Sequence, residues 1–171
     1  MLKGERIVLR QIESEAEYKD YLMRLNQLEH RAITDHTELV SIPKMLQAFH
    51  QGDLWTKDYG RLFIQVDDRL IGDLSFTRKS ELEISIGYRM ISLDHKRKGY
   101  MTEALKLFIK YLFDSIPLIT RLSLLTAEDN LPSRKLAEKC GFSQEGVLRQ
   151  AYFYRGKICN WILYSILREE T

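Results

Sequence analysis

The chain has 171 residues, 44% of them hydrophobic and 29% charged, and its formal net charge is +2. That length and composition predict a single globular domain, 1–171, whose core needs no disulfide or metal. The balanced charge excludes a strongly basic nucleic-acid-binding surface, and the absence of a run of about 18 apolar residues excludes a membrane-spanning helix. The first residues lack the apolar segment of a signal peptide, so we expect a cytoplasmic protein.

The first third of the chain predicts a strand and two helices. Residues 6–10 alternate polar and apolar side chains, as strands do. Ser14 followed by Glu17 is the pattern of a helix-capping box, and a helical apolar face comes after it. Residues 28–60 have the weakest pattern, although Pro43 near a first helical position predicts a short helix there. The apolar face of the first helix consists of Tyr18, Tyr21, Leu22 and Leu25.

The middle of the chain predicts three strands. Residues 61–66 and 70–76 are apolar runs on either side of Asp67-Asp68, which is the pattern of a hairpin. Residues 81–91 alternate between an apolar and a polar face. Gly87 lies in the middle of this third run and indicates either a β-bulge or a close approach of another group.

The stretch 94–105 is the strongest local indication of a binding site. It places three consecutive cations, Lys96, Arg97 and Lys98, before Gly99 and the start of an apolar helical face. The first turn of a helix has unpaired N–H groups and a partial positive charge, and a glycine lets a ligand approach the backbone. The pattern therefore predicts an anion site, and the alternative is a solvated basic turn before an ordinary surface helix.

The last third predicts a strand at 122–126, a helix and a hairpin. The helix begins at a cap, Asn130 or Asp129, and ends before Gly141. The hairpin strands are 146–154 and 158–167. Strands interleaved with a few helices predict an α/β (α+β) domain, with a central mixed and mostly antiparallel twisted sheet flanked by helices.

Four short motifs, in this order, resemble those of the GNAT acetyltransferases and especially the RimJ/RimL branch. Each motif is weak alone, but their order and spacing together are specific, and the resemblance covers nearly the whole chain. They are Ile86-Gly87-Tyr88, then Lys98-Gly99-Tyr100-Met101-Thr102-Glu103-Ala104, then Asn130-Leu131-Pro132-Ser133 with Glu138-Lys139-Cys140-Gly141-Phe142, and finally Glu145-Gly146-Val147-Leu148-Arg149.

The resemblance implies transfer of an acetyl group from acetyl-CoA to a primary amine in a ternary complex. A protein N-terminal amine is the favoured acceptor, and the alternatives are a small-amine acetyltransferase or a CoA-binding sensor or interaction module without turnover. It implies no metal, and the four histidines of the chain show no metal-ligand spacing. Whether the chain forms a homodimer stays open.

The resemblance also implies a set of residues that bind the cofactor. Family members bind pyrophosphate on the amides of a loop with the pattern Gln/Arg-x-x-Gly-x-Gly/Ala, and this chain departs from that pattern at its first and last positions. Main-chain amides do most of the binding, so we expect the departures to be tolerated. The implied pyrophosphate residues are Lys96, Arg97, Lys98, Gly99, Tyr100, Met101 and Thr102. The implied pantetheine or thiol contacts are Arg89, Met90, Ile91, Asn130 and Ser133, although Asn130 is equally explained as a helix cap.

For catalysis the resemblance implies a donor to the departing thiolate and a base for the amine. Many GNAT enzymes use a tyrosine as the donor, but the matching position here is Ala137. The RimJ/RimL branch uses the serine of Asn-x-x-Ser instead, which indicates Ser133 as a hydrogen-bond donor to sulfur. Glu83 is the candidate base, although its near relatives carry the glutamate where this chain has Ser85, and a solvent-facing strand glutamate is the alternative.

The acceptor side is the least decodable part of the sequence. Tyr152 and Tyr154 lie in the final hairpin, where they could line the acceptor pocket or simply be amphipathic core. Residues 28–60 should also border the acceptor, and their sequence does not identify it.

Overall fold

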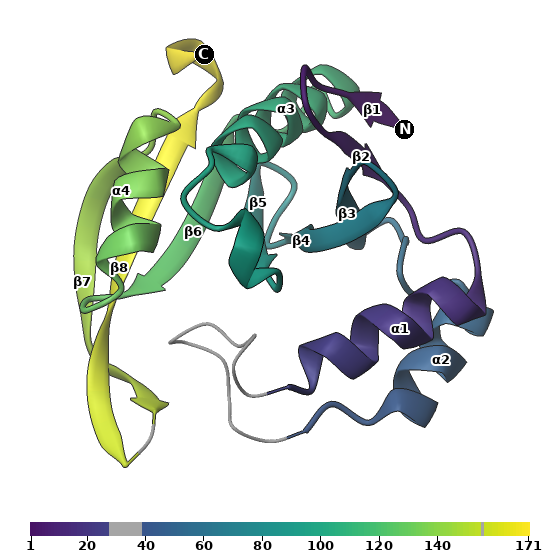
Figure 1. Ribbon diagram of the computed structural model, residues 1–171. Coiled ribbons are helices and arrows are strands. Elements are labelled where there is room, and N and C mark those ends of the chain that lie inside the picture. Colours follow the sequence, from purple (N-terminus) through teal and green to yellow (C-terminus); the bar gives the residue numbers. More distant parts are fainter. Residues whose placement is uncertain (28–38, 155) are drawn as a thin grey trace.

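The computed structural model describes residues 1–27, 39–154 and 156–171, and these build one sheet with helices on both faces (Figure 1). The sheet has eight strands in the order β1-β2-β3-β4-β5-β6-β8-β7. The strands are β1 (Leu2–Lys3), β2 (Val8–Arg10), β3 (Tyr59–Val66), β4 (Arg69–Arg78), β5 (Glu83–Met90), β6 (Arg121–Ala127), β7 (Ser143–Tyr154) and β8 (Lys157–Leu167). The helices are α1 (Glu15–Leu25), α2 (Ile42–Gln51), α3 (Tyr100–Ser115) and α4 (Leu131–Lys139), with short 3-10 turns at Leu93–His95 and Arg168–Glu170.

Neighbouring strands are antiparallel except for β5 and β6, which run parallel. This confirms the expected mixed, mostly antiparallel sheet. The first predicted strand is shorter than expected, because only Val8–Arg10 of residues 6–10 pairs with β3. No helix in the described part of the chain is both long and apolar enough to cross a bilayer.

Side-chain alternation along the strands divides the core between the two faces of the sheet. In β3, Leu62 and Ile64 point to the face covered by α3, whereas Phe63 points to the face covered by α1. The helices match this division, since Phe108 of α3 belongs to the first cluster and Tyr21 of α1 to the second. The helical face predicted for residues 18–25 is confirmed, because all four of its apolar side chains are buried.

Predicted helix boundaries are confirmed at their caps. The Ser14 hydroxyl accepts from the amide of Glu17 at 3.2 Å and begins α1. The Asn130 carboxamide accepts from the amide of Ser133 at 3.3 Å and begins α4, which decides between the two predicted caps of that helix. Gly141, with a φ of 94°, follows the end of α4, as expected for a glycine that ends a helix.

Gly87 lies in a regular part of the β4–β5 pair, where it faces Ser75 without a shift of register. It is therefore no bulge in this pair, and the close-approach alternative is the correct one. A Cβ atom at Gly87 would lie 2.9 Å from the Ser75 hydroxyl oxygen, so a larger residue would force that side chain to move.

Candidate active site

The segment between β5 and α3 is a loop whose backbone turns sharply at two residues. Arg97 and Gly99 both have positive φ angles, 62° and 86°, and Gly99 is the N-cap of α3. Within the described residues, the amides from Arg97 to Thr102 donate to no protein acceptor. Successive amides that converge in this way, at the positive end of a helix, form an anion-binding nest.

The charge of the loop adds to this preference for anions. Lys96, Arg97 and Lys98 are all exposed, so their ammonium and guanidinium groups are free to approach a ligand from solvent. Free amides, a helix N-terminus and three cations together suit a diphosphate. The structure thus brings together the predicted residues 96–102 in one loop and the first turn of α3.

Arg6 holds this loop in place and was missed by sequence reasoning. Its guanidinium donates to the Lys98 carbonyl oxygen at 3.0 Å and to the Glu103 carboxylate at 3.0 Å, and its backbone amide donates to Glu103 at 2.8 Å. It also lies over the Tyr100 ring, 5.0 Å from the centroid. Burial acts to raise the pKa of Glu103, but the hydrogen bonds from Arg6 outweigh it and lower that pKa.

The parallel pair of β5 and β6 separates shortly after it begins. Pairing covers only Glu83, Ile84 and Ser85 of β5, opposite residues 121–123 of β6. Beyond Ser85 the two strands diverge, and in Figure 1 the half of the sheet from β1 to β5 parts from the half made of β6, β8 and β7. β5 therefore has no pairing with β6 beyond Ser85 in the described residues, and a strand edge opened in this way can pair with an amide-bearing ligand such as pantetheine.

The three predicted pantetheine residues of this region lie in different surroundings. Arg89 faces Asp73 across the β4–β5 pair, on the face covered by α1. Met90 packs against the core beneath α3. Ile91 is fully buried on the α1 face and its amide donates to the Ile71 carbonyl at 2.9 Å, so that amide is already used.

Ser133 lies at the open end of the separated strands, where Tyr88 of β5 reaches it. The phenol and serine oxygens are 2.7 Å apart, and the phenol also lies 3.2 Å from the Ser133 carbonyl oxygen. Burial raises the pKa of Tyr88 to about 12, against the opposing effect of its bond to Ser133. Both hydroxyls are therefore protonated at neutral pH. Tyr88 belongs to one of the quoted motifs, but its partner on α4 was not predicted.

Two further side chains on the α4 face, those of Thr126 and Ala137, are relevant to the chemistry of the open end. The Thr126 hydroxyl of β6 is buried and has no hydrogen-bond partner among the described residues, which is unusual for a buried polar group and typical of a ligand site. Ala137, at the position where many GNAT enzymes carry a tyrosine, is fully buried. A hydroxyl donor can thus come from Ser133 but not from position 137.

Glu83, the predicted base, lies at the other end of the pair. Its carboxylate accepts from the Ser123 hydroxyl at 2.5 Å and lies 3.6 Å from Arg121 Nε. Arg121 in turn forms a bidentate pair with Glu145, at 2.5 Å for each bond. Tyr88 lies five positions after Glu83, which is roughly 16 Å along a strand. The role of Glu83 as a base stays a prediction, and its contacts support a structural role.

The predicted acceptor tyrosines are partly described. Tyr152 lies against Trp161, with 4.3 Å between the ring centroids, and Leu125 on the neighbouring strand β6 is exposed. The side chain of Tyr154 lies outside the described part. An aromatic and aliphatic surface therefore lies beside the open end.

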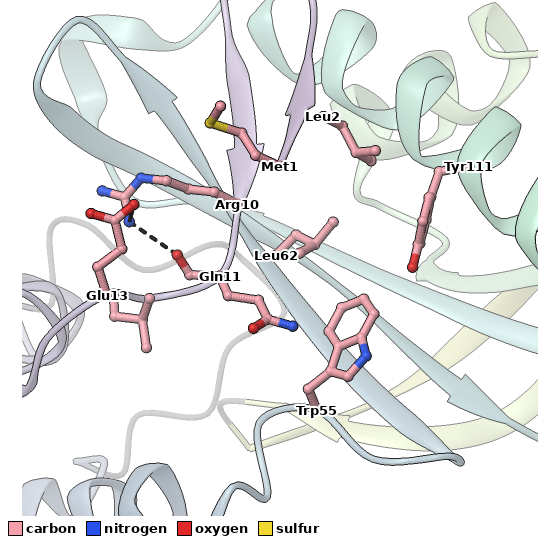
Figure 2. A pocket seen from close by; sticks show the side chains of 9 residues that line it. Met1, Leu2, Arg10, Gln11, Glu13, Trp55, Leu62 and Tyr111 are labelled. Carbon is pink, nitrogen blue, oxygen red and sulfur yellow. Dashed lines mark hydrogen bonds and ion pairs between the residues drawn. The ribbon is translucent and has the colours of Figure 1, made fainter.

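A separate cavity lies on another part of the molecule. Figure 2 shows a cavity of about 440 Å³ beside β1 to β3, with Trp55, Leu62 and Tyr111 on one side and Arg10 and Glu13 on another. No residue of the nest or of the separated strands lines it. The shallow open end, and not this cavity, contains the groups that suit the cofactor.

Comparisons with known proteins identify the family of the chain. Residues 6–143 match the family model described as "Acetyltransferase (GNAT) domain". The chain is 33% identical over 101 residues to Uncharacterized N-acetyltransferase YoaA of Bacillus subtilis, a match that covers 58% of this chain and 56% of the relative. It is 27% identical over 176 residues to Uncharacterized N-acetyltransferase p20 of Bacillus licheniformis, covering 99% and 97%.

A solved structure shares the fold. RimL, described as a ribosomal L7/L12 alpha-N-protein acetyltransferase in complex with coenzyme A, superposes with a TM-score of 0.82 at 16% identity. The match covers 98% of this chain and 97% of that one. The family match extends from Arg6, which holds the nest, through the loop and Ser133. The chain therefore belongs to the GNAT acetyltransferase family and is an acetyl-CoA-dependent N-acetyltransferase.

Proposed function

We propose that the enzyme acetylates the N-terminal amine of a protein or peptide, with Ser133 as the hydrogen-bond donor to the departing sulfur. The observation that carries this proposal is the open end of β5 and β6, which lies between the amide nest of residues 97–102 and the Ser133 hydroxyl. The nest suits the pyrophosphate of acetyl-CoA, the β5 edge suits pantetheine, and Ser133 then lies at the thiol.

The chemistry follows from these positions. Acetyl-CoA supplies a thioester carbon that accepts the amine nitrogen and a sulfur that leaves with the bonding electron pair. A nitrogen–carbon bond forms, the carbon–sulfur bond breaks, and the proton lost by the amine balances the one gained by sulfur. Ser133 contributes a neutral O–H that stabilises charge on sulfur as it develops. The residues of the nest hold the phosphates and fix the reacting geometry.

Two observations support a peptide acceptor over a polyamine. The surface beside the open end carries Leu125, Tyr152 and Trp161, which suit the side chains that follow an N-terminal amine. RimL, which shares the fold, is described as acting on a protein α-amine.

The test is thiol release from acetyl-CoA with a panel of amines. We expect turnover with short peptides that have a free N-terminus and none with the same peptides acetylated beforehand, which are the matched controls. Rapid turnover of spermidine or free lysine without turnover of any peptide would contradict the proposed acceptor. Tight CoA binding with no release on any amine would contradict the activity itself.

Replacement of the proposed donor tests the mechanism separately. Ser133→Ala should lower kcat about 100-fold to 1,000-fold, the range for a single donor to a developing charge, and leave the Kd for CoA within about twofold. Calorimetry with CoA measures the second quantity. Unchanged kcat would remove Ser133 from the mechanism.

A further inference from the structure

The pairing of Tyr88 with Ser133 joins two elements that otherwise meet only across the open end of the sheet. Tyr88 follows Ile84 and Ile86 on the α3 and α4 face of β5, and those two isoleucines are core residues. The phenol extends from there to the first turn of α4, 2.7 Å from the Ser133 hydroxyl. It is the side chain of β5 that touches the proposed donor.

Ser133 is held at two separate points. Its amide donates to the Asn130 carboxamide, which fixes the backbone, and its hydroxyl meets Tyr88, which fixes the side chain. Without a partner, a serine hydroxyl in a helix turns back to a carbonyl of the preceding turn. The contact with Tyr88 competes with that alternative, because it fixes the position of the hydroxyl oxygen.

The single phenol proton can serve only one of its two neighbours. If Tyr88 donates to the Ser133 carbonyl, the serine hydroxyl gives its own proton to the phenol oxygen and has none left for a ligand. If Tyr88 donates to the serine oxygen, the serine proton is free to point elsewhere. Both neighbours lie within hydrogen-bond distance, 3.2 Å and 2.7 Å, so the pair can exchange between the two states.

We propose that Tyr88 is the positioning residue for Ser133: its phenol donates to the serine oxygen and thereby aims the serine O–H at the sulfur of the bound cofactor. This inference rests on the proposed function of Ser133. A donor chain of two hydroxyls strengthens the terminal O–H, because each hydrogen bond polarises the next.

Tyr88 keeps its proton throughout. Burial raises its pKa to about 12, so the residue donates a hydrogen bond at neutral pH and does not act as a proton source. No net proton leaves the pair, and the stoichiometry of amine and thiol is unchanged.

The molecule offers a matched control in Tyr164. This tyrosine is also buried on the α4 face, and its hydroxyl donates to Glu138 at 2.8 Å and accepts from Arg134 at 3.3 Å, both on α4. Tyr164→Phe therefore removes a hydroxyl that anchors the same helix without touching Ser133. A fall in kcat that Tyr88→Phe and Tyr164→Phe share would therefore reflect weaker attachment of α4 and not a loss of the contact with Ser133.

The first experiment is a double-mutant cycle in kcat. Tyr88→Phe should lower kcat about tenfold in the wild-type background, the effect of one hydrogen bond, with KM for acetyl-CoA within about twofold. In the Ser133→Ala background the same change should have almost no effect. Tyr164→Phe should lower kcat equally in both backgrounds, if at all. Equal effects of Tyr88→Phe in both backgrounds, or no effect in either, would overturn the proposal.

The second experiment does not depend on turnover. Protein labelled with ¹³C at the tyrosine ζ carbon gives a resonance for Tyr88 that is assigned by its loss in Tyr88→Phe. Adding CoA should shift this resonance in the wild type, because the phenol proton changes partner, and the shift should be absent in Ser133→Ala. The same shift in both proteins would overturn the proposal. If no amine releases thiol, the proposed function fails, and this measurement still decides the pairing.

Discussion

The two ends of the β5–β6 pair differ in chemistry although they belong to the same strands. The paired end carries charged groups. Glu83 accepts a hydrogen bond from Ser123 and lies beside Arg121. Arg121 donates two hydrogen bonds of 2.5 Å to the Glu145 carboxylate. The open end carries the neutral hydroxyls of Tyr88 and Ser133 on the α4 face, opposite to the face of Arg89, and the two strands do not pair there.

The contrast between charged groups at one end and neutral hydroxyls at the other has a physical reason. An ion pair at the open end would lose its water when the cofactor arrived, and this desolvation would oppose binding. Neutral hydroxyls and amides cost less to cover and gain hydrogen bonds from the ligand. At the paired end nothing enters, so charged groups can join the strands permanently.

Gly99→Val should have the largest effect on CoA binding. The substitution lies in the nest and not at the open end itself. A β-branched side chain at a φ of 86° is strained, and its Cβ would lie 3.3 Å from the Arg6 guanidinium. We expect the Kd for CoA to rise at least about 100-fold, as measured by calorimetry, from the lost approach to the phosphates. Gly52→Val is the matched control, since Gly52 also has a positive φ but nothing lies near its Cβ. Unchanged affinity would place the pyrophosphate elsewhere.

Arg6→Ala should weaken CoA binding less, by about tenfold, because the amides remain but the loop loses its attachment to the Lys98 carbonyl and Glu103. Arg6→Lys keeps the charge but cannot form the same forked set of bonds. If Arg6→Lys binds CoA about as weakly as Arg6→Ala, the geometry of the hydrogen bonds matters more than the charge. If Arg6→Lys binds CoA as tightly as the wild type, the proposed anchoring is contradicted.

At the paired end, Glu145 should make stability depend on pH. The hydrogen bond from Arg121, then that from Ser165, lowers its pKa to about 2 from the ordinary value of 4.5. Its contribution is therefore complete above about pH 5 and is lost as the pH falls toward 2. Glu145→Gln should lower the melting temperature at neutral pH and reduce the difference between neutral and acidic pH. A parallel decline with acid in both proteins would show that other carboxylates dominate.

Glu83→Gln should have the smallest effect on turnover. The amide can still accept from Ser123, so we expect kcat to fall no more than about threefold and stability to fall by about 1 kcal/mol or less, because the side chain is partly exposed. A general base would instead show a loss of about 100-fold or more. That larger loss would restore Glu83 to the mechanism and contradict the division of roles between the two ends.

Local patterns in the sequence were sufficient for much of the fold and for the nest. A basic loop with Gly99 before an apolar helical face needs only neighbouring residues to be recognised, and the structure places it at the start of α3. The caps at Ser14 and Asn130 are local in the same sense, since each accepts from an amide three residues on.

Contacts between distant residues could not be predicted in this way. Arg6 and Glu103 are 97 positions apart, and Tyr88 and Ser133 are 45 apart. No periodicity in the chain relates such pairs. The predicted base illustrates the same limit, because strand alternation gives the face of Glu83 but not the place along the strand where β5 and β6 part.

The attachment of the nest through Arg6 has a consequence for how the protein acquires its activity. The loop and its anchor are separated by most of the first hundred residues, including four strands of the sheet. A growing chain that has just released residues 96–102 from the ribosome must first dock its own beginning before the loop is held. Cofactor affinity should thus emerge late and abruptly during synthesis, together with closure of the sheet, so that a partly folded chain does not compete for acetyl-CoA.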